Sequence, residues 1–404
     1  MPVRFDVNRV RECYPALAEG YVHFDSAAGS LVAVESARAI AGVTGSAVGN
    51  KTTAFEPGRR ALEITAAARS AVADLVGGVP DGVVFGQSAT ALTYLVSRTL
   101  AADWAPGDEV VVSRLDHDAN VRPWLQAAAR AGATVRWAEF DPATGELPVD
   151  QYEKLVTDRT RVVAVTAASN AIGTRPDVAA IAAIAHAAGA LVYVDGVHAT
   201  PHLPTDVGEL GADFYVTSAY KWSGPHIAAC VADPALWERL RPEKLNPAPD
   251  TVPERFEHGT LSFELLAGVT GAVDHLAGLL DHGPSRASRR ERILASMAAV
   301  HAYEQGLLER LVTGLEGIDG VTMCPASRDR CPTVSFRVAD QHPAQTSRLL
   351  AERRICVYDG DNYAFEYFDR MGLRDSGSAV RASIYHYTTE EDVQRLLDGV
   401  HAIR

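Results

Sequence analysis

The feature that most constrains the fold is the alternation of short apolar segments with helical segments between about residues 60 and 235. The apolar segments, among them EVVVSR, RVVAVTAAS and LVYVDG, are nearly continuous, and the segments between them, such as AAIAAIAHAAG, are typical of helices. Strands that are apolar on both faces and alternate with helices form parallel sheets that helices cover on both sides. We therefore predict an α/β fold whose large domain has a mostly parallel sheet flanked by helices.

The pattern changes after residue 240. The segment RPEKLNPAPDTVPERFEHGT is irregular and rich in proline, and a long helix is expected from about Ser288 to Leu315. Strands are expected at VTMCP, TVSFRV, CVYDG and AVRASIYHY, with two helices among them. These elements predict a smaller α+β C-terminal domain. We place the large domain at residues 21–281 and the small domain at residues 1–20 and 282–404.

Charge and cysteine content exclude several classes of protein. The 38 basic and 51 acidic residues give a net charge of −13 that is spread along the chain, which disfavours nucleic acid as a partner. The first residues lack the apolar core of a signal peptide, and no apolar run is long enough to cross a bilayer, so no membrane association is expected. The five cysteines are scattered without a CxxC pair, which favours a cytoplasmic protein with no disulfide frame and no metal site.

Lysine is used sparingly in this chain. Only four lysines occur, at positions 51, 154, 221 and 244, and arginine supplies nearly all the remaining positive charge. Lys221 ends the apolar strand DFYVTSAYK and precedes the turn WSGPH. A lysine beside a strand is ordinarily a surface residue, but a desolvated primary amine can lose its proton and attack an aldehyde, which a guanidinium cannot do. Lys221 is therefore the candidate for a covalent bond to a cofactor aldehyde.

Asp195 ends the preceding apolar strand, LVYVDG, so a parallel sheet would set it beside Lys221 at one cleft. A carboxylate at this place either caps the next helix or holds the ring nitrogen of a pyridine cofactor, whose protonated ring withdraws electrons from a substrate carbanion. His198, three residues later, is either structural or reaches the phenolic oxygen of that ring. The pair of Lys221 and Asp195 indicates pyridoxal phosphate.

Three other segments follow strand ends. GQSATAL begins a helix, where backbone N–H groups at Ser88, Ala89 and Thr90 would face a phosphate, although such residues also cap helices in general. His117, in LDHDAN, either stacks on a flat ring or lies in a solvated loop. Asn170, in ASNAIGT, would donate to a cofactor oxygen or a substrate carboxylate. No single segment is decisive, but their order along successive strand ends supports one cofactor site.

Arg381 lies within the apolar strand AVRASIYHY of the small domain. An arginine inside an apolar strand needs a partner, and a substrate α-carboxylate offers bidentate geometry. A structural salt bridge to a neighbouring acid is the alternative explanation. Arg381 is thus the candidate for binding the substrate.

The ordered motifs resemble the class V aminotransferase family and, within it, the cysteine desulfurase branch. The resemblance runs nearly end to end, through FDSAAGS, SAT, DHDAN, SNAIGT, VDGVHA, SAYKWSGP, FEHGT and VRASIYHY. It implies the aminotransferase fold type I, with pyridoxal phosphate in the large domain and an amino acid as the small-molecule substrate. It also implies a homodimer with active sites at the subunit boundary.

Transferred to this sequence, the roles in the family fall on the residues already singled out. Lys221 would carry the cofactor as a Schiff base, and it would form the catalytic set with His117, which stacks on the ring, and Asp195, which holds the ring nitrogen. The other cofactor contacts would be Ser88, Ala89, Thr90, Asn170, His198, Ser218, Tyr220 and Thr260, the last reaching the phosphate in the site of the partner subunit. The substrate contacts would be Asn170, Tyr363 and Arg381.

The sequence departs from the desulfurase pattern at two places. Desulfurases carry a nucleophilic cysteine on the loop after the strand that here reads ICVYDG, and Tyr363 stands at the matching position. Cys356 lies upstream within the strand, where a small buried hydrophobic residue is the simpler interpretation. Tyr220 stands where desulfurases tend to have histidine, and His198 replaces a glutamine. Without the cysteine a persulfide relay has no acceptor, and the other changes affect proton transfer near Lys221.

The function favoured by these residues is a cysteine-desulfurase-like carbon–sulfur lyase or a related elimination. Transamination and epimerisation remain open, because proton loss from the substrate to Lys221 is common to all three. A catalytically silent binding or scaffold protein is the alternative from another class, and the presence of both Lys221 and Asp195 argues against it. A nicotinamide enzyme would need a GxGxxG turn in the first strand–helix unit, where the sequence has none.

Overall fold

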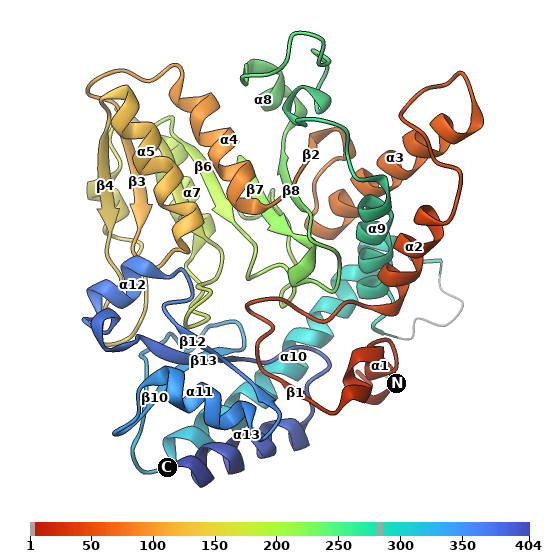
Figure 1. Ribbon diagram of the computed structural model, residues 1–404. Coiled ribbons are helices and arrows are strands. Elements are labelled where there is room, and N and C mark those ends of the chain that lie inside the picture. The colour runs from red at the N-terminus through yellow and green to blue at the C-terminus, as the bar shows by residue number, and fades with distance from the viewer. Residues whose placement is uncertain (1–4, 281–285) are drawn as a thin grey trace.

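The large domain is built on a seven-stranded sheet (Figure 1). The computed structural model describes residues 5–280 and 286–404. The strand order is β2-β8-β7-β6-β5-β3-β4, and only β8 runs antiparallel to its neighbours. The strands are β2 (Val83–Gly86), β3 (Glu109–Ser113), β4 (Thr134–Ala138), β5 (Thr160–Thr166), β6 (Leu191–Asp195), β7 (Phe214–Ser218) and β8 (Ala228–Ala232). The prediction of a mostly parallel sheet is confirmed.

Helices cover both faces of this sheet, which explains the continuous apolar strands. In β3, Val110 and Val112 join the hydrophobic core on one side of the sheet, and Val111 joins the core on the other side. The first side is covered by α4 (Ala89–Ala101) and α5 (Arg122–Ala131), and the second by α3 (Glu56–Val76), α7 (Val178–Ala187) and α9 (Phe263–Ala277). The other helices of this domain are α2 (Val34–Thr44), which packs on α9, and the short helices α6 (Tyr152–Leu155) and α8 (Pro234–Arg239).

The small domain lies beneath the carboxyl ends of the parallel strands (Figure 1). Its antiparallel sheet has the order β12-β13-β10-β9, from β9 (Val321–Met323), β10 (Thr333–Val338), β12 (Tyr358–Gly360) and β13 (Ala379–Ser383). Its helices are α11 (Pro343–Ala351), α12 (Phe365–Arg370) and α13 (Glu390–Ile403). The α+β prediction agrees with these elements.

The long helix α10 (Arg289–Glu316) connects the two domains and matches the predicted helix closely. It begins with a capping box, because the Ser288 side chain accepts from the backbone of Glu291 while the Glu291 carboxylate accepts from the backbone of Ser288. The predicted boundary between residues 281 and 282 lies outside the described residues. Within the parts of the chain that the structure describes, no helix is long and apolar enough to span a membrane.

The N-terminal segment contacts both domains. Tyr14, just after α1 (Val7–Arg11), packs in the core beneath the large sheet, although the predicted boundary assigns it to the small domain. Conversely β1 (Val22–His23) pairs in parallel with β11 (Ile355–Cys356), and Phe24 joins the small-domain core. The N-terminal segment thus contributes to both cores, and the predicted change of domain at residue 20 stays a prediction.

Candidate active site

A cavity of about 800 Å³ opens at the carboxyl ends of the parallel strands, between the large sheet and the small domain. Ligand sites in such sheets lie at this edge, because successive strand–helix loops meet there. The predicted site residues that line the cavity are Ser88, Ala89, Thr90, His117, Asn170, Asp195, His198, Ser218, Tyr220, Lys221, Tyr363 and Arg381. The fold thus brings together residues that are nearly 300 positions apart in the sequence, while their individual roles stay predictions.

Lys221 projects from a turn rather than from a strand end. β7 ends at Ser218, and a single 3₁₀ turn over Ala219–Lys221 carries the amine into the cavity. Its Nζ donates a hydrogen bond to the carbonyl of Ala27 and lies 4.9 Å from the centre of the Tyr220 ring. Burial and the nearby Arg381 guanidinium lower the pKa of Lys221 to about 7, against the opposing effect of Asp195. A useful fraction of this amine is therefore neutral near physiological pH.

Asp195 is the last residue of β6, as predicted, and is buried at the cavity wall. Its carboxylate accepts a hydrogen bond from the backbone N–H of Val197 at 2.9 Å. Burial raises the pKa of Asp195 to about 6, while this hydrogen bond and Lys221 lower it. A buried carboxylate of this kind is suited to pair with a protonated ring nitrogen.

His117 presents a neutral, flat ring to the cavity. Its Nδ1 accepts from the backbone N–H of Ala119 at 3.0 Å, so the ring proton of the neutral form is on Nε2. Burial, together with Lys221 and Arg381, lowers the pKa of His117 to about 3. The ring stacks on Tyr363 with centroids 5.4 Å apart and an interplanar angle of 20°.

The start of α4 provides a place for an anion. Ser88 is the N-cap, and its hydroxyl accepts from the backbone N–H of Ala91 at 3.1 Å. The first N–H groups of a helix have no partner within the helix, and the helix dipole favours negative charge there. Ala89 and Thr90 also line the cavity. This end of α4 therefore has the features of a phosphate site.

Arg381 is buried in β13 and is only 3% exposed. Its Nη1 donates to the backbone carbonyl of Asn170 at 2.9 Å, whereas its buried Nε has no hydrogen-bond partner. No ion pair to Arg381 occurs within residues 5–280 and 286–404, so the alternative of a structural salt bridge has no support. Burial lowers the pKa of Arg381 to about 10, which leaves it charged. The carboxylate of Asp25 raises this pKa from a distance but makes no ion pair with Arg381. A buried cation with no ion-pair partner among the described residues indicates that a ligand supplies the anion.

Asn170 connects this arginine to the loop after β12. The Nδ2 of Asn170 donates to the backbone carbonyl of Asn362 at 2.8 Å, and its buried Oδ1 has no partner. Asn362 and Tyr363 both have positive φ, at 51° and 59°, a conformation that costs non-glycine residues energy. The loop is held in place because the carbonyl of Tyr363 also accepts from the backbone N–H of Asp118 at 2.7 Å.

Thr260 does not line the cavity of its own chain. It borders a separate hollow of about 320 Å³ together with Gln87 and His226. His226 in turn stacks on Tyr220, with ring centroids 4.7 Å apart and an interplanar angle of 5°. The predicted contact of Thr260 with the partner's phosphate stays a prediction.

Two site features were missed by sequence reasoning. Asp116 is fully buried behind Asp195; it accepts from Asn120 at 2.7 Å, and burial raises its pKa to about 8. Arg122 lines the cavity as a second arginine, but it pairs with Asp118 at 2.8 Å and with Glu366. Asp116 lies within the LDHDAN motif and Arg122 lies two residues after it, so only their nearness to His117 offered a signal. Because Arg122 is paired with two carboxylates, it does not offer a free cation to a ligand.

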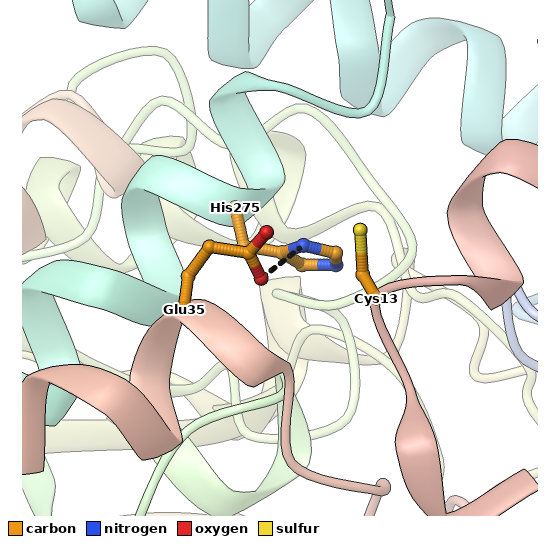
Figure 2. A group of neighbouring side chains, drawn as sticks. All are labelled: Cys13, Glu35 and His275. Atoms are coloured by element: carbon orange, nitrogen blue, oxygen red, sulfur yellow. Dashed lines mark ion pairs between the residues drawn. The ribbon is translucent and has the colours of Figure 1, made fainter. Parts of the chain in front are cut away.

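No cysteine lines the cavity, and all five cysteines lie within the described residues. Cys356 pairs with His23 in the small β1–β11 sheet, and burial raises the pKa of its thiol. Cys13 lies beside Glu35 and His275 (Figure 2), and burial raises its pKa to about 11. His275 pairs with Glu35 at 3.2 Å and with the hydroxyl of Tyr14 at 2.8 Å, so this cluster is explained as packing of α2 on α9. The predicted absence of a metal stays a prediction.

The chain is similar over nearly its whole length to known proteins. The family model for class-V aminotransferases matches residues 22–396. An uncharacterized protein of Mycobacterium tuberculosis is 37% identical over 99% of this chain and 99% of its own length. The aminotransferase-like protein FGM3 of Gibberella zeae is 32% identical over 99% of this chain and 98% of its own length. The chain therefore belongs to the class V aminotransferase family, and it is a pyridoxal-phosphate-dependent enzyme.

A solved structure narrows the position of the chain within this family. The cysteine desulfurase CsdA of Escherichia coli matches with a TM-score of 0.86 and 28% identity, covering 98% of both chains. This match confirms the predicted fold type and the predicted resemblance to the cysteine desulfurase branch.

Proposed function

We propose that this enzyme cleaves a carbon–sulfur or related bond at the β-carbon of an amino acid that enters the cavity at Lys221. The proposal rests on two buried polar atoms that lack hydrogen-bond partners and belong to residues lining the same cavity as Lys221. Among the residues that the structure describes, the buried Nε of Arg381 has no acceptor and the buried Oδ1 of Asn170 has no donor. An amino acid has both an anionic carboxylate and an amine, which complement these two atoms.

The residues present fit pyridoxal phosphate. The start of α4 at Ala89 and Thr90, together with Ser218, would hold the phosphate, and Asp195 would hold the ring nitrogen. His117 would lie against the ring, and Lys221 would bond the aldehyde carbon. When bound, this cofactor supplies an aldehyde that captures amines and a ring that withdraws electrons from the substrate Cα. Each of these side chains lines the same cavity, which supports the assignment.

The residues of the chain then have distinct tasks in an elimination. Arg381 fixes the substrate carboxylate and so orients the Cα–H bond. The neutral amine of Lys221 takes the Cα proton, the electron pair of that bond forms the Cα–Cβ double bond, and the Cβ–S bond breaks with sulfur leaving as a thiolate. The unsaturated amine that is released reacts with water to give a keto acid and ammonia. We assign protonation of the leaving group to Tyr220, which lines the cavity and whose ring centre lies 4.9 Å from the Lys221 amine.

Transfer of sulfur to an enzyme cysteine is not part of this proposal. The described cavity lining contains no thiol, and Tyr363 occupies the loop where desulfurases carry their nucleophile.

We expect Cys356→Ser to leave kcat/KM within about twofold of the wild-type value, because its thiol lies in the β1–β11 sheet and outside the cavity. Steady-state kinetics with the best substrate measures this. A loss of kcat/KM of more than tenfold would indicate that Cys356 accepts sulfur in a persulfide relay.

We also propose a homodimer in which Thr260 completes the phosphate site of the partner subunit. Thr260 is exposed and lies outside the cavity of its own chain, which agrees with such a role. The five free cysteines support the proposal of a cytoplasmic location.

The test of the function is a panel of amino acids offered to the purified, cofactor-loaded enzyme. We expect S-substituted cysteines to release a thiol, a keto acid and ammonia in equal amounts. Conversion of the cofactor to its amine form, reversed by an added keto acid, would instead establish a transaminase. Loss of optical activity without products would establish an epimerase. If neither the cofactor nor any amino acid binds, the protein is a silent relative and the proposal is wrong.

A further inference from the structure

A buried histidine–glutamate pair lies directly behind His198. The Nδ1 of His202 is 2.9 Å from the Oε2 of Glu304, and the two residues are 1% and 0% exposed. The second carboxylate oxygen of Glu304 is buried and has no hydrogen-bond partner within residues 5–280 and 286–404. Neither residue lines the cavity.

At the position of Glu304, an apolar side chain would cost less free energy to bury. It lies on the interior face of α10, in line with the buried Val300, Leu307, Leu308 and Leu311. A buried ion pair is seldom more stable than well-packed apolar side chains, and an unsatisfied carboxylate oxygen adds a further cost. The pair therefore needs an explanation other than stability of the core.

His198 provides that explanation, because it connects the pair to the cavity. The rings of His198 and His202 meet edge to face, with centroids 5.4 Å apart and an interplanar angle of 67°. The Nε2 of His198 is 3.0 Å from the hydroxyl of Thr333 on β10. Its Nδ1 makes no hydrogen bond within the described parts of the chain, and the residue lines the cavity. One ring nitrogen is thus fixed by the small domain, and the other is free for a ligand.

Building on the proposed function, we propose that Glu304 and His202 are positioning residues that hold the imidazole of His198 in the orientation that presents Nδ1 to the cofactor ring. Glu304 fixes the ring plane of His202 through Nδ1, and His202 fixes His198 by edge-to-face contact. Thr333 lies on β10 of the small domain, and Glu304 lies on α10, which connects the two domains. The orientation of His198 therefore depends on how the two domains dock.

The charges around His198 favour its neutral form. Burial lowers the pKa of His198 well below its usual value, and His202, Arg381 and Lys221 act in the same direction. Asp195 on β6 is the opposing carboxylate at the cavity wall, and Glu304 lies beyond His202.

A double-mutant cycle on cofactor affinity tests this coupling. We expect Glu304→Gln to raise the Kd for pyridoxal phosphate about tenfold, the loss of one good hydrogen bond, and His198→Asn to raise it by a similar factor. If Glu304 acts through His198, the double variant should bind no more weakly than His198→Asn alone. Additive losses would show that Glu304 is merely structural and would overturn the proposal. His202→Asn serves as the second probe if Glu304→Gln does not fold, and its loss should likewise vanish in the His198→Asn background.

A second experiment measures the tautomer of His198 in the absence of cofactor. In apoprotein labelled with ¹⁵N-histidine, we expect His198 to remain one neutral tautomer between about pH 6 and 8. Glu304→Gln should mix the two neutral tautomers, because the ring of His198 is no longer held in one orientation. The matched control is His386→Gln. His386 is another buried histidine; it bonds to the hydroxyl of Tyr14 at 2.6 Å and does not line the cavity. This substitution should change neither the Kd for pyridoxal phosphate nor the His198 signals. Failure of wild-type protein to bind pyridoxal phosphate would sink the proposed function, whereas unchanged His198 signals in Glu304→Gln would sink only this inference.

Discussion

Replacement of Lys221 by alanine is expected to lower kcat/KM by at least about 1,000-fold, because one side chain supplies both the covalent bond to the cofactor and the base that takes the Cα proton. Lys221→Arg should be equally inactive, since a guanidinium keeps its charge and cannot attack an aldehyde. Both losses should appear in kcat measured with saturating cofactor. Activity of either variant above a few per cent of wild type would mean that another group performs the chemistry.

The control is Lys244→Ala, which removes a lysine that pairs with Asp250 at 3.0 Å and lies outside the cavity. It should keep full activity.

The pH dependence of cofactor capture by the wild-type protein gives a further check on Lys221. With a pKa of about 7 for Lys221, the rate at which apoprotein captures pyridoxal phosphate should rise between about pH 5 and 7 and level off above about pH 8. An ordinary lysine amine, with its pKa at 10.5, would give a rate that still rises at pH 9.

Arg381→Gln should reduce kcat/KM by about 100-fold, the usual loss when one partner of a buried charge pair is removed. The substitution keeps hydrogen-bonding capacity but leaves the substrate carboxylate without a cation. Arg337→Gln is the matched control. Arg337 lies on the adjacent strand β10, donates to the carbonyls of Ser376 and Ser378, and is outside the cavity.

Substrate analogues make this second prediction specific. An amine that lacks the carboxylate should react slowly with the wild-type enzyme and no more slowly with Arg381→Gln. If the variant loses the same factor with both substrates, Arg381 supports the fold of the cavity and does not bind the carboxylate.

The sequence predicted the parts of the fold that depend on local patterns. Val110, Val111 and Val112 signal a strand that is buried on both faces, and this continuity is enough to indicate a parallel sheet. Site residues such as Asp195 follow because the ends of parallel strands meet at one edge. The extent of the strand before Lys221 was less accurate, because the 3₁₀ turn after Ser218 has the same apolar composition as the strand itself.

Contacts between distant segments could not be predicted in the same way. The hydrogen bond from Asn170 to the carbonyl of Asn362 depends on how the small domain docks, which no local pattern encodes. The pair of His202 and Glu304 did leave a signal, since Glu304 is an acid at an apolar position of a long amphipathic helix. Its partner, however, is 102 residues away and becomes known only from the structure.

The most direct test of the account is to find which amine holds the cofactor. Protein loaded with pyridoxal phosphate is reduced with borohydride, which makes the bond permanent, and is then digested for peptide mass spectrometry. We expect the mass of one reduced cofactor on the peptide that contains SAYKWSGP, at Lys221, and on no other peptide. A label on Lys51, Lys154 or Lys244, or no label at all, would contradict the central claim.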